Sequence, residues 1–108
     1  MTNPDTILFS YGRNDFEWHL LKAASNERKH GVTFEEAATI FEDDLAVLLD
    51  DEDHSDDESR FVLLGLSEKR RLLSVAHIER GSRLRIISAR LASGIERRDY
   101  DREAGVGV

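Results

Sequence analysis

The first half of the chain has the pattern of one short strand followed by two helices. Residues 16–18 alternate apolar and polar side chains, as a half-buried strand does. Residues 20–30 are rich in helix formers and are followed by a glycine, the residue that commonly ends a helix. Thr33 and Glu36 have the spacing of a capping box, in which each side chain satisfies an amide of the other residue, and they predict a second helix to about Phe41.

The second half has the pattern of consecutive strands and a closing helix. Short polar turns and one acidic loop separate four apolar segments, at 45–49, 61–66, 72–78 and 84–89. Ser93 and Glu96 repeat the capping-box spacing and predict a last helix toward Arg102. Because strands joined by short turns pair antiparallel, we expect an α+β fold, with the earlier helices packed on a small antiparallel sheet and a C-terminal helix.

One domain is expected at 16–103. Before it lies an arm, 1–15, with at most a short strand at 7–9, and after it a frayed tail, 104–108. No apolar run approaches the roughly 20 residues that a membrane span needs, and no signal segment is recognised at the start of the chain. The chain contains no cysteine, which suits a reducing compartment. We therefore expect a cytoplasmic protein that does not bind a membrane.

Charge is unevenly distributed along the chain. The 108 residues carry a formal net charge of −7, which by itself argues against nucleic-acid binding. Residues 1–59 hold 4 Lys and Arg and 16 Asp and Glu, a net of −12, whereas 60–108 hold 11 and 6, a net of +5. The basic half is either an anion-binding surface or the solvated faces of strands and a helix, and charge alone favours the second interpretation.

The basic half centres on a predicted hairpin with its turn near Gly81, and the hairpin register decides which side chains share a face. A two-residue loop would pair Arg80 with Arg83 and mix polar and apolar residues on both faces. A three-residue loop ending at Gly81 would instead pair His77 with Arg83. We expect the second register, because it separates an apolar face from a solvent-accessible patch of His77, Arg83 and Arg85.

This expected patch has the groups that RNA cleavage by the 2′-hydroxyl needs. Arginines hold phosphates bidentately, and a histidine can accept or donate a proton near neutral pH. The transition state also needs positive charge near the phosphate. The alternative is that His77 is a satisfied strand histidine and that Arg83 and Arg85 only keep the strands soluble. The residue types alone slightly favour this alternative.

Ordered motifs over residues 16–100 resemble the BrnT-type toxins. The matching motifs are Phe-Glu-Trp at 16–18, Lys-His-Gly-Val at 29–32, Phe-Glu-Glu-Ala at 34–37, Asp-His at 53–54, Gly-Leu-Ser at 65–67, Arg-Ile-Ile-Ser-Ala-Arg at 85–90 and Glu-Arg-Arg at 96–98, with His77 and Tyr100. Each motif is short, and the ordered set makes the resemblance specific. His19 stands where an aspartate is usual, so the resemblance does not extend to a capping, catalytic or antitoxin-binding role of that aspartate.

The resemblance implies a compact RelE-like ribonuclease fold and a toxin of a type II toxin–antitoxin system. We expect this toxin to cleave RNA by acid–base catalysis without a metal or other cofactor. It also implies a BrnA-like antitoxin that binds the toxin directly and carries the DNA-binding part, so that operator DNA is reached only through the antitoxin. The usual assembly has a toxin on each side of an antitoxin dimer. The alternative function is a catalytically weak or inactive binding module that serves as antitoxin partner in autoregulation of the operon.

Five residues are candidate catalytic groups. His77 is the leading general acid or base, and Arg85 is the leading phosphate contact. Glu58 and Arg60 flank the start of a predicted strand and form either a base with a phosphate clamp or a structural ion pair. Glu79 is a further candidate base, although its place in the predicted turn ranks it below His77.

Five more basic residues are candidate RNA contacts: Arg80, Arg83, Arg90, Lys22 and Lys29. Lys22 and Lys29 lie seven residues apart and so share one helix face, where they either anchor phosphates or are simply solvated. Arg90 either reaches the site from the sheet edge or pairs with a carboxylate, and we favour the ion pair.

The acidic loop at 50–59 invites a metal-site interpretation, because His54 lies there among five aspartates. The loop lacks the glycine turn and the closing glutamate of a calcium-binding loop, so no metal site is predicted. We expect the loop to be solvated or to contact a basic segment of the antitoxin.

Overall fold

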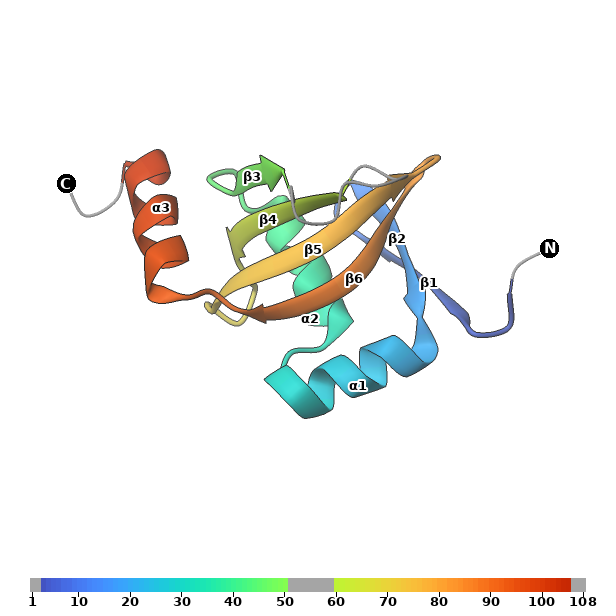
Figure 1. Ribbon diagram of the computed structural model, residues 1–108. Helices are drawn as coiled ribbons and strands as arrows, with labels where there is room; N and C mark the ends of the chain where they lie inside the picture. Colours follow the sequence, from blue (N-terminus) through green and yellow to red (C-terminus); the bar gives the residue numbers. More distant parts are fainter. Residues whose placement is uncertain (1–2, 51–59, 106–108) are drawn as a thin grey trace.

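The computed structural model describes residues 3–50 and 60–105, and its framework is one six-stranded sheet (Figure 1). The strands are β1 (Thr6–Tyr11), β2 (Asn14–His19), β3 (Val47–Asp50), β4 (Arg60–Leu66), β5 (Leu72–Arg80) and β6 (Arg83–Leu91). The helices are α1 (Leu20–His30), α2 (Phe34–Thr39), the short 3-10 helix η1 (Ile40–Glu42) and α3 (Gly94–Ala104). The predicted α+β class is confirmed, and no helix in the described part of the chain is long and apolar enough to cross a membrane.

The strands lie in the order β1-β2-β6-β5-β4-β3, and every neighbouring pair is antiparallel except β2 and β6. Those two are parallel and pair only at Phe16↔Leu84 and Glu17↔Arg85. The expected antiparallel sheet is confirmed for the other four pairs and is wrong at this junction, because the short-turn rule applies only to consecutive strands. The predicted strand at 7–9 is present and is longer, since β1 pairs with β2 along its whole length.

The face of the sheet that packs on α2, here termed the inner face, holds the main core. Phe16 and Trp18 of β2 and Ile86 of β6 are almost completely buried there. Trp18 meets Phe34 of α2 edge-on, with ring centroids 5.7 Å apart. Because successive side chains of a strand alternate between faces, Glu17 points to the opposite face, here termed the outer face.

α3 covers one end of the outer face (Figure 1). Tyr100 packs there with Leu64 and Leu72, and its hydroxyl donates to Asp43 Oδ2 at 2.7 Å. Burial and this hydrogen bond raise the pKa of Tyr100 to about 12. The capping box predicted at the start of α3 is fully formed, so the helix begins where the sequence indicated.

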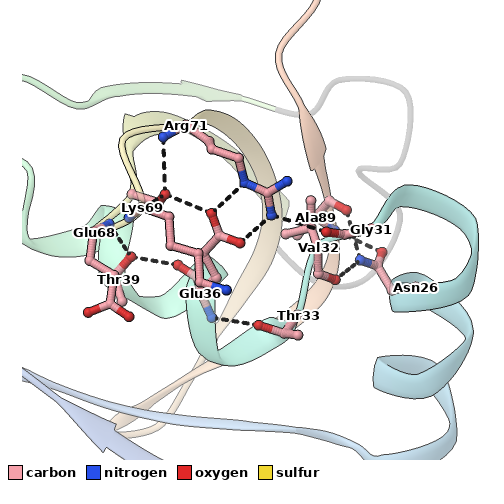
Figure 2. A network of polar contacts seen from close by, with 11 residues as sticks. Asn26, Gly31, Val32, Thr33, Glu36, Thr39, Glu68, Lys69, Arg71 and Ala89 are labelled. Atoms are coloured by element: carbon pink, nitrogen blue, oxygen red, sulfur yellow. Dashed lines mark hydrogen bonds and ion pairs between the residues drawn. The ribbon is translucent and has the colours of Figure 1, made fainter.

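A buried ion pair ties α2 to the turn between β4 and β5 (Figure 2). The carboxylate of Glu36, a residue only 2% exposed, accepts from Arg71 Nε at 2.9 Å and from the Ser67 hydroxyl at 2.7 Å. Arg71 also donates to the Gly31 carbonyl at 3.0 Å. One guanidinium thus holds both α2 and the connection that precedes it, and its hydrogen bond lowers the pKa of Glu36.

The capping box predicted for α2 is only half formed. Thr33 accepts from the Glu36 amide at 3.0 Å, as expected, but the Glu36 carboxylate turns to Arg71 instead of returning to Thr33. A charge-assisted hydrogen bond to a guanidinium is stronger than one to a neutral amide. The reciprocal half of the predicted box is therefore wrong, and the helix itself ends at Thr39, where η1 continues the turn.

The hairpin of β5 and β6 has the register that the sequence pattern disfavoured. Arg80 pairs with Arg83 across a two-residue loop whose Gly81 has a φ of 61°, so the expected three-residue loop is wrong. Farther along, a register shift between Ala76 and His77 marks a β-bulge. The extra residue reverses the alternation of side chains along β6. Constant alternation along the hairpin would favour the three-residue loop, and the bulge removes that constant alternation.

Replacing Glu36 with glutamine should destabilise the fold in a pH-dependent way. Breaking a fully buried ion pair costs about 3–5 kcal/mol; we expect about 2 kcal/mol at neutral pH, because the Arg71 side chain is 35% exposed. Since the pKa of Glu36 is lowered in the fold, its contribution is present above about pH 4 and is lost as the pH falls through the folded pKa. Urea unfolding of both proteins at neutral pH and at about pH 3 checks this, and a constant difference in unfolding free energy would contradict it.

Candidate functional site

His77, the leading candidate from the sequence, is buried on the inner face. It is 3% exposed, and its ring packs against Phe41 and Phe61 with centroid distances of 4.9 and 5.9 Å. Its Nδ1 lies 3.4 Å from the Val75 carbonyl, and burial lowers the pKa of His77. Its cross-strand partner is Ile86. The expected solvent-accessible patch of one histidine and two arginines is therefore wrong.

Glu79, the other candidate base in the hairpin, does not lie beside the arginines either. Glu79 pairs with Leu84 at the exposed end of the hairpin and belongs to the inner face. Glu58 falls outside the described residues. Arg60 pairs with Ile78, which places it on the outer face. The histidine and the predicted arginines thus lie on opposite sides of the sheet.

One row of side chains crosses the outer face from β1 to β4. The pairs along it are Leu8↔Glu17, Glu17↔Arg85, Arg85↔Ile78 and Ile78↔Arg60. Directly paired residues share a face of the sheet and lie close together. The carboxylate of Glu17 therefore stands beside the guanidinium of Arg85 in the middle of the row.

A cavity of about 340 Å³ opens on this face, and we refer to it as the arginine pocket. The hairpin, β2, β1 and the segment before β1 all contribute to its lining, which consists of Arg80, Arg83, Arg85, Glu17, Thr6, Leu8 and Asn3. The lining thus includes three arginines and one glutamate, within a chain that is negative overall. The structure thus brings together three of the arginines that the sequence singled out.

Glu17 and Arg85 form an ion pair inside the arginine pocket. Glu17 Oε2 accepts from Arg85 Nη1 at 2.7 Å, and the two side chains are 11% and 18% exposed. Within the described residues, Glu17 Oε1 accepts no hydrogen bond. A guanidinium has five donors, so Arg85 can hold Glu17 and a phosphate at the same time.

The remaining candidate RNA contacts lie outside the arginine pocket. Arg90 pairs with Glu96 of α3 through nitrogen–oxygen distances of 2.7 and 3.0 Å, which is the alternative that the sequence favoured. Lys22 and Lys29 line a second cavity between α1 and β6. Their predicted position on one face of the helix is confirmed.

His19, which stands where the resemblance leads one to expect an aspartate, caps α1. Its Nδ1 accepts from the Leu21 amide at 3.1 Å and satisfies a donor at the first turn of α1. The unusual residue at this position therefore preserves the start of the helix.

Glu17 is the site residue that the sequence analysis missed. Its position between two buried aromatic residues indicates that it points away from the core. Nothing in the local sequence indicates that Arg85 stands beside it, because that proximity depends on the parallel pairing of β2 and β6.

The arrangement is suited to phosphodiester chemistry. Guanidiniums bind the non-bridging oxygens of a phosphate and stabilise the charge that develops on them, while a carboxylate can accept a proton. Across residues 3–50 and 60–105, no group of three or more histidines, cysteines, aspartates or glutamates could hold a metal ion. The acidic loop around His54 lies almost entirely outside that part of the chain.

The sequence was also matched against models of known protein families. The sequence model of a family described as the ribonuclease toxin BrnT of type II toxin–antitoxin systems matches residues 18–96. The matched segment contains Arg80, Arg83 and Arg85 and begins directly after Glu17. A comparison with curated proteins found no similar sequence.

The burial of His77 predicts a pH dependence of stability. Because its pKa is lowered in the fold, the stability that the neutral ring contributes is present above about pH 6.5, the usual pKa of a histidine, and is lost as the pH falls below it. His77→Leu should remove this part of the loss between pH 7 and about pH 5. Thermal unfolding across that range measures it, and identical pH profiles for the two proteins would contradict the prediction.

The same variant tests the catalytic role predicted for His77 from the sequence. If folded His77→Leu still cleaves RNA like the wild type, the ring takes no part in the chemistry. If the variant folds normally and loses cleavage, His77 is restored as a catalytic residue.

Proposed function

We propose that this chain, which belongs to the BrnT family of ribonuclease toxins of type II toxin–antitoxin systems, is an endoribonuclease that cleaves RNA in the arginine pocket. The observation that carries the proposal is the convergence of three guanidiniums and one carboxylate in a single cavity. The guanidiniums match a phosphodiester in charge and geometry. The carboxylate supplies a proton acceptor beside it.

In the proposed reaction, Glu17 Oε1 takes the proton of a ribose 2′-hydroxyl. The 2′-oxygen attacks the phosphorus, and the bond to the 5′-oxygen breaks with its electron pair. That oxygen takes a proton from water, and Glu17 later returns its own proton to solvent. The products are a 2′,3′-cyclic phosphate and a free 5′-hydroxyl.

Arg85 has two tasks in this scheme. It orients the Glu17 carboxylate through the 2.7 Å hydrogen bond, and its remaining donors bind the phosphate that Glu17 activates the hydroxyl to attack. Arg80 and Arg83 contribute further positive charge at the same phosphate. The scheme is metal-independent, because guanidiniums supply the positive charge that a metal ion supplies in other nucleases.

Arg60 has a supporting place in the proposal. It lies on the outer face, one strand beyond Ile78, in the row that contains Glu17 and Arg85. From there it can contact the RNA backbone beyond the arginine pocket. In this proposal Glu17 is the general base, whereas the sequence indicated His77 as the leading general acid or base.

The family implies a protein antitoxin, and we propose a BrnA-like antitoxin as that partner. In this proposal the antitoxin carries the DNA-binding part, two toxins flank an antitoxin dimer, and operator DNA is reached only through the antitoxin. The proposed RelE-like fold and cytoplasmic location agree with an RNA substrate.

Glu17→Gln should keep the fold and reduce RNA cleavage by about 10²- to 10³-fold, because general-base catalysis contributes on that order. Arg85→Lys should also reduce cleavage, since an ammonium keeps the charge and loses the bidentate contact. Cleavage of RNA by purified protein in the presence of a chelator measures both effects, together with growth arrest on expression without the antitoxin.

The matched control is Asp15→Asn, which removes an exposed carboxylate from the same strand and face outside the arginine pocket. It should leave cleavage unchanged. A wild-type protein that binds its antitoxin and leaves RNA and cell growth untouched would contradict the proposed function and would support the inactive binding module instead.

A further inference from the structure

A second basic cavity lies between α1 and β6, with a volume of about 210 Å³. We refer to it as the lysine cavity. Its lining includes Lys22, Lys29 and His30 of the helix, with Ser25 and Ser88 at its wall. None of the lining residues is acidic, so the cavity offers a positive field and hydroxyl donors to an anion.

The cavity exists because α1 replaces β2 beside β6. β2 pairs with β6 only as far as Arg85. Beyond that point the Asn26 side chain takes the strand edge (Figure 2), accepting from the Ala89 amide at 3.0 Å and donating to the Ala89 carbonyl at 2.8 Å. Ile87 lies between Arg85, where the pairing with β2 ends, and Ala89, which binds Asn26. It has no cross-strand partner on β5, and a bulged strand bends at such a residue. The bend and the change of neighbour leave the space that the cavity occupies.

The helix holds both lysines over this space. Lys22 lies four residues before Asn26 and Lys29 three residues after it, spacings that put all three on one helix face. Because Asn26 is bonded to β6, the lysines flank the cavity, about 10 Å apart along the helix axis. Within residues 3–50 and 60–105 neither ammonium group has an ion-pair partner, so both charges can act on a ligand.

The lysine cavity continues the arginine pocket along one face of β6. Arg85 pairs with Ile78, and Ser88 pairs with Ala76. Ile78 and Ala76 are two residues apart on β5, so their partners point to the same face, about 7 Å apart along the strand. A polyanion that leaves the arginine pocket along β6 therefore meets the lysine cavity next.

We propose that the lysine cavity is a second phosphate subsite, which binds the backbone of single-stranded RNA beside the phosphate held in the arginine pocket. The inference rests on the proposed ribonuclease function and extends it to the path of the substrate. Lysines bind phosphates as point charges, so this subsite holds the strand in register without reading the identity of its bases.

The test uses the full chain and a fluorescent single-stranded RNA hexamer with 2′-O-methyl riboses, which cannot be cleaved by the 2′-hydroxyl. Binding is measured between about 50 and 200 mM salt, where the slope of log affinity against log salt changes by about 0.7 for each phosphate of a single strand that the protein neutralises. The double variant Lys22→Gln/Lys29→Gln should bind more weakly and lower the slope by about 0.7 or more. Glutamine keeps the helix propensity, and circular dichroism verifies the fold.

The matched control is Arg28→Gln, which removes an exposed cation of α1 that does not line the lysine cavity. It should change the slope much less than the lysine variant. Arg85→Ala reports on the arginine pocket in the same assay.

Three outcomes overturn the inference. Equal effects of the lysine variant and Arg28→Gln would remove the subsite and leave the proposed function standing, provided that Arg85→Ala weakens binding. Loss of antitoxin binding with unchanged RNA binding would assign the cavity to an acidic segment of the partner. A wild-type protein that does not bind the hexamer would overturn the subsite and the proposed function together.

Discussion

The two-residue parallel contact between β2 and β6 is the constraint on which the outer face depends. It sets Phe16 beside Leu84 in the core and, on the other side of the sheet, Glu17 beside Arg85. Because the contact ends at Arg85, the next part of the strand edge is left to α1, and the bonds of Asn26 to that edge frame the lysine cavity. One short pairing between distant segments therefore creates the conditions for both proposed subsites.

Two buried or half-buried ion pairs illustrate how surroundings decide the use of the same residue types. The buried carboxylate of Glu36 accepts hydrogen bonds from Arg71 and Ser67. These hydrogen bonds hold α2 in place. Glu17 accepts from Arg85 through one oxygen, and its side chain lines a cavity that two more arginines also line. The first pair is suited to stability, because all its partners come from the fold itself. In the second pair, one oxygen of Glu17 accepts no hydrogen bond from the described residues, so it can accept one from a substrate.

The two faces of the sheet have separate chemistry for a packing reason. The inner face is filled by aromatic rings, and His77 lies among them with its pKa lowered by burial. The outer face is covered by α3 only at one end, around Tyr100. Long charged side chains are costly to bury, so the arginines of the hairpin occupy the end that α3 leaves uncovered. Which face a residue occupies thus matters more for its role than which strand carries it.

The sequence by itself determined the local secondary-structure elements and the family to which the chain belongs. The capping box of Ser93 and Glu96 and the helix over Leu20–His30 depend only on residues close in sequence, and the structure contains both. Three of the arginines that are concentrated in the second half of the sequence line one cavity. The tertiary structure decided which of these residues meet. A single bulge reverses side-chain alternation without any sequence signature of its own, and a parallel pairing between distant strands has no local pattern. The two-residue loop puts His77 and Arg85 on opposite faces of one hairpin, and the parallel pairing brings Glu17 to Arg85 from the other half of the chain.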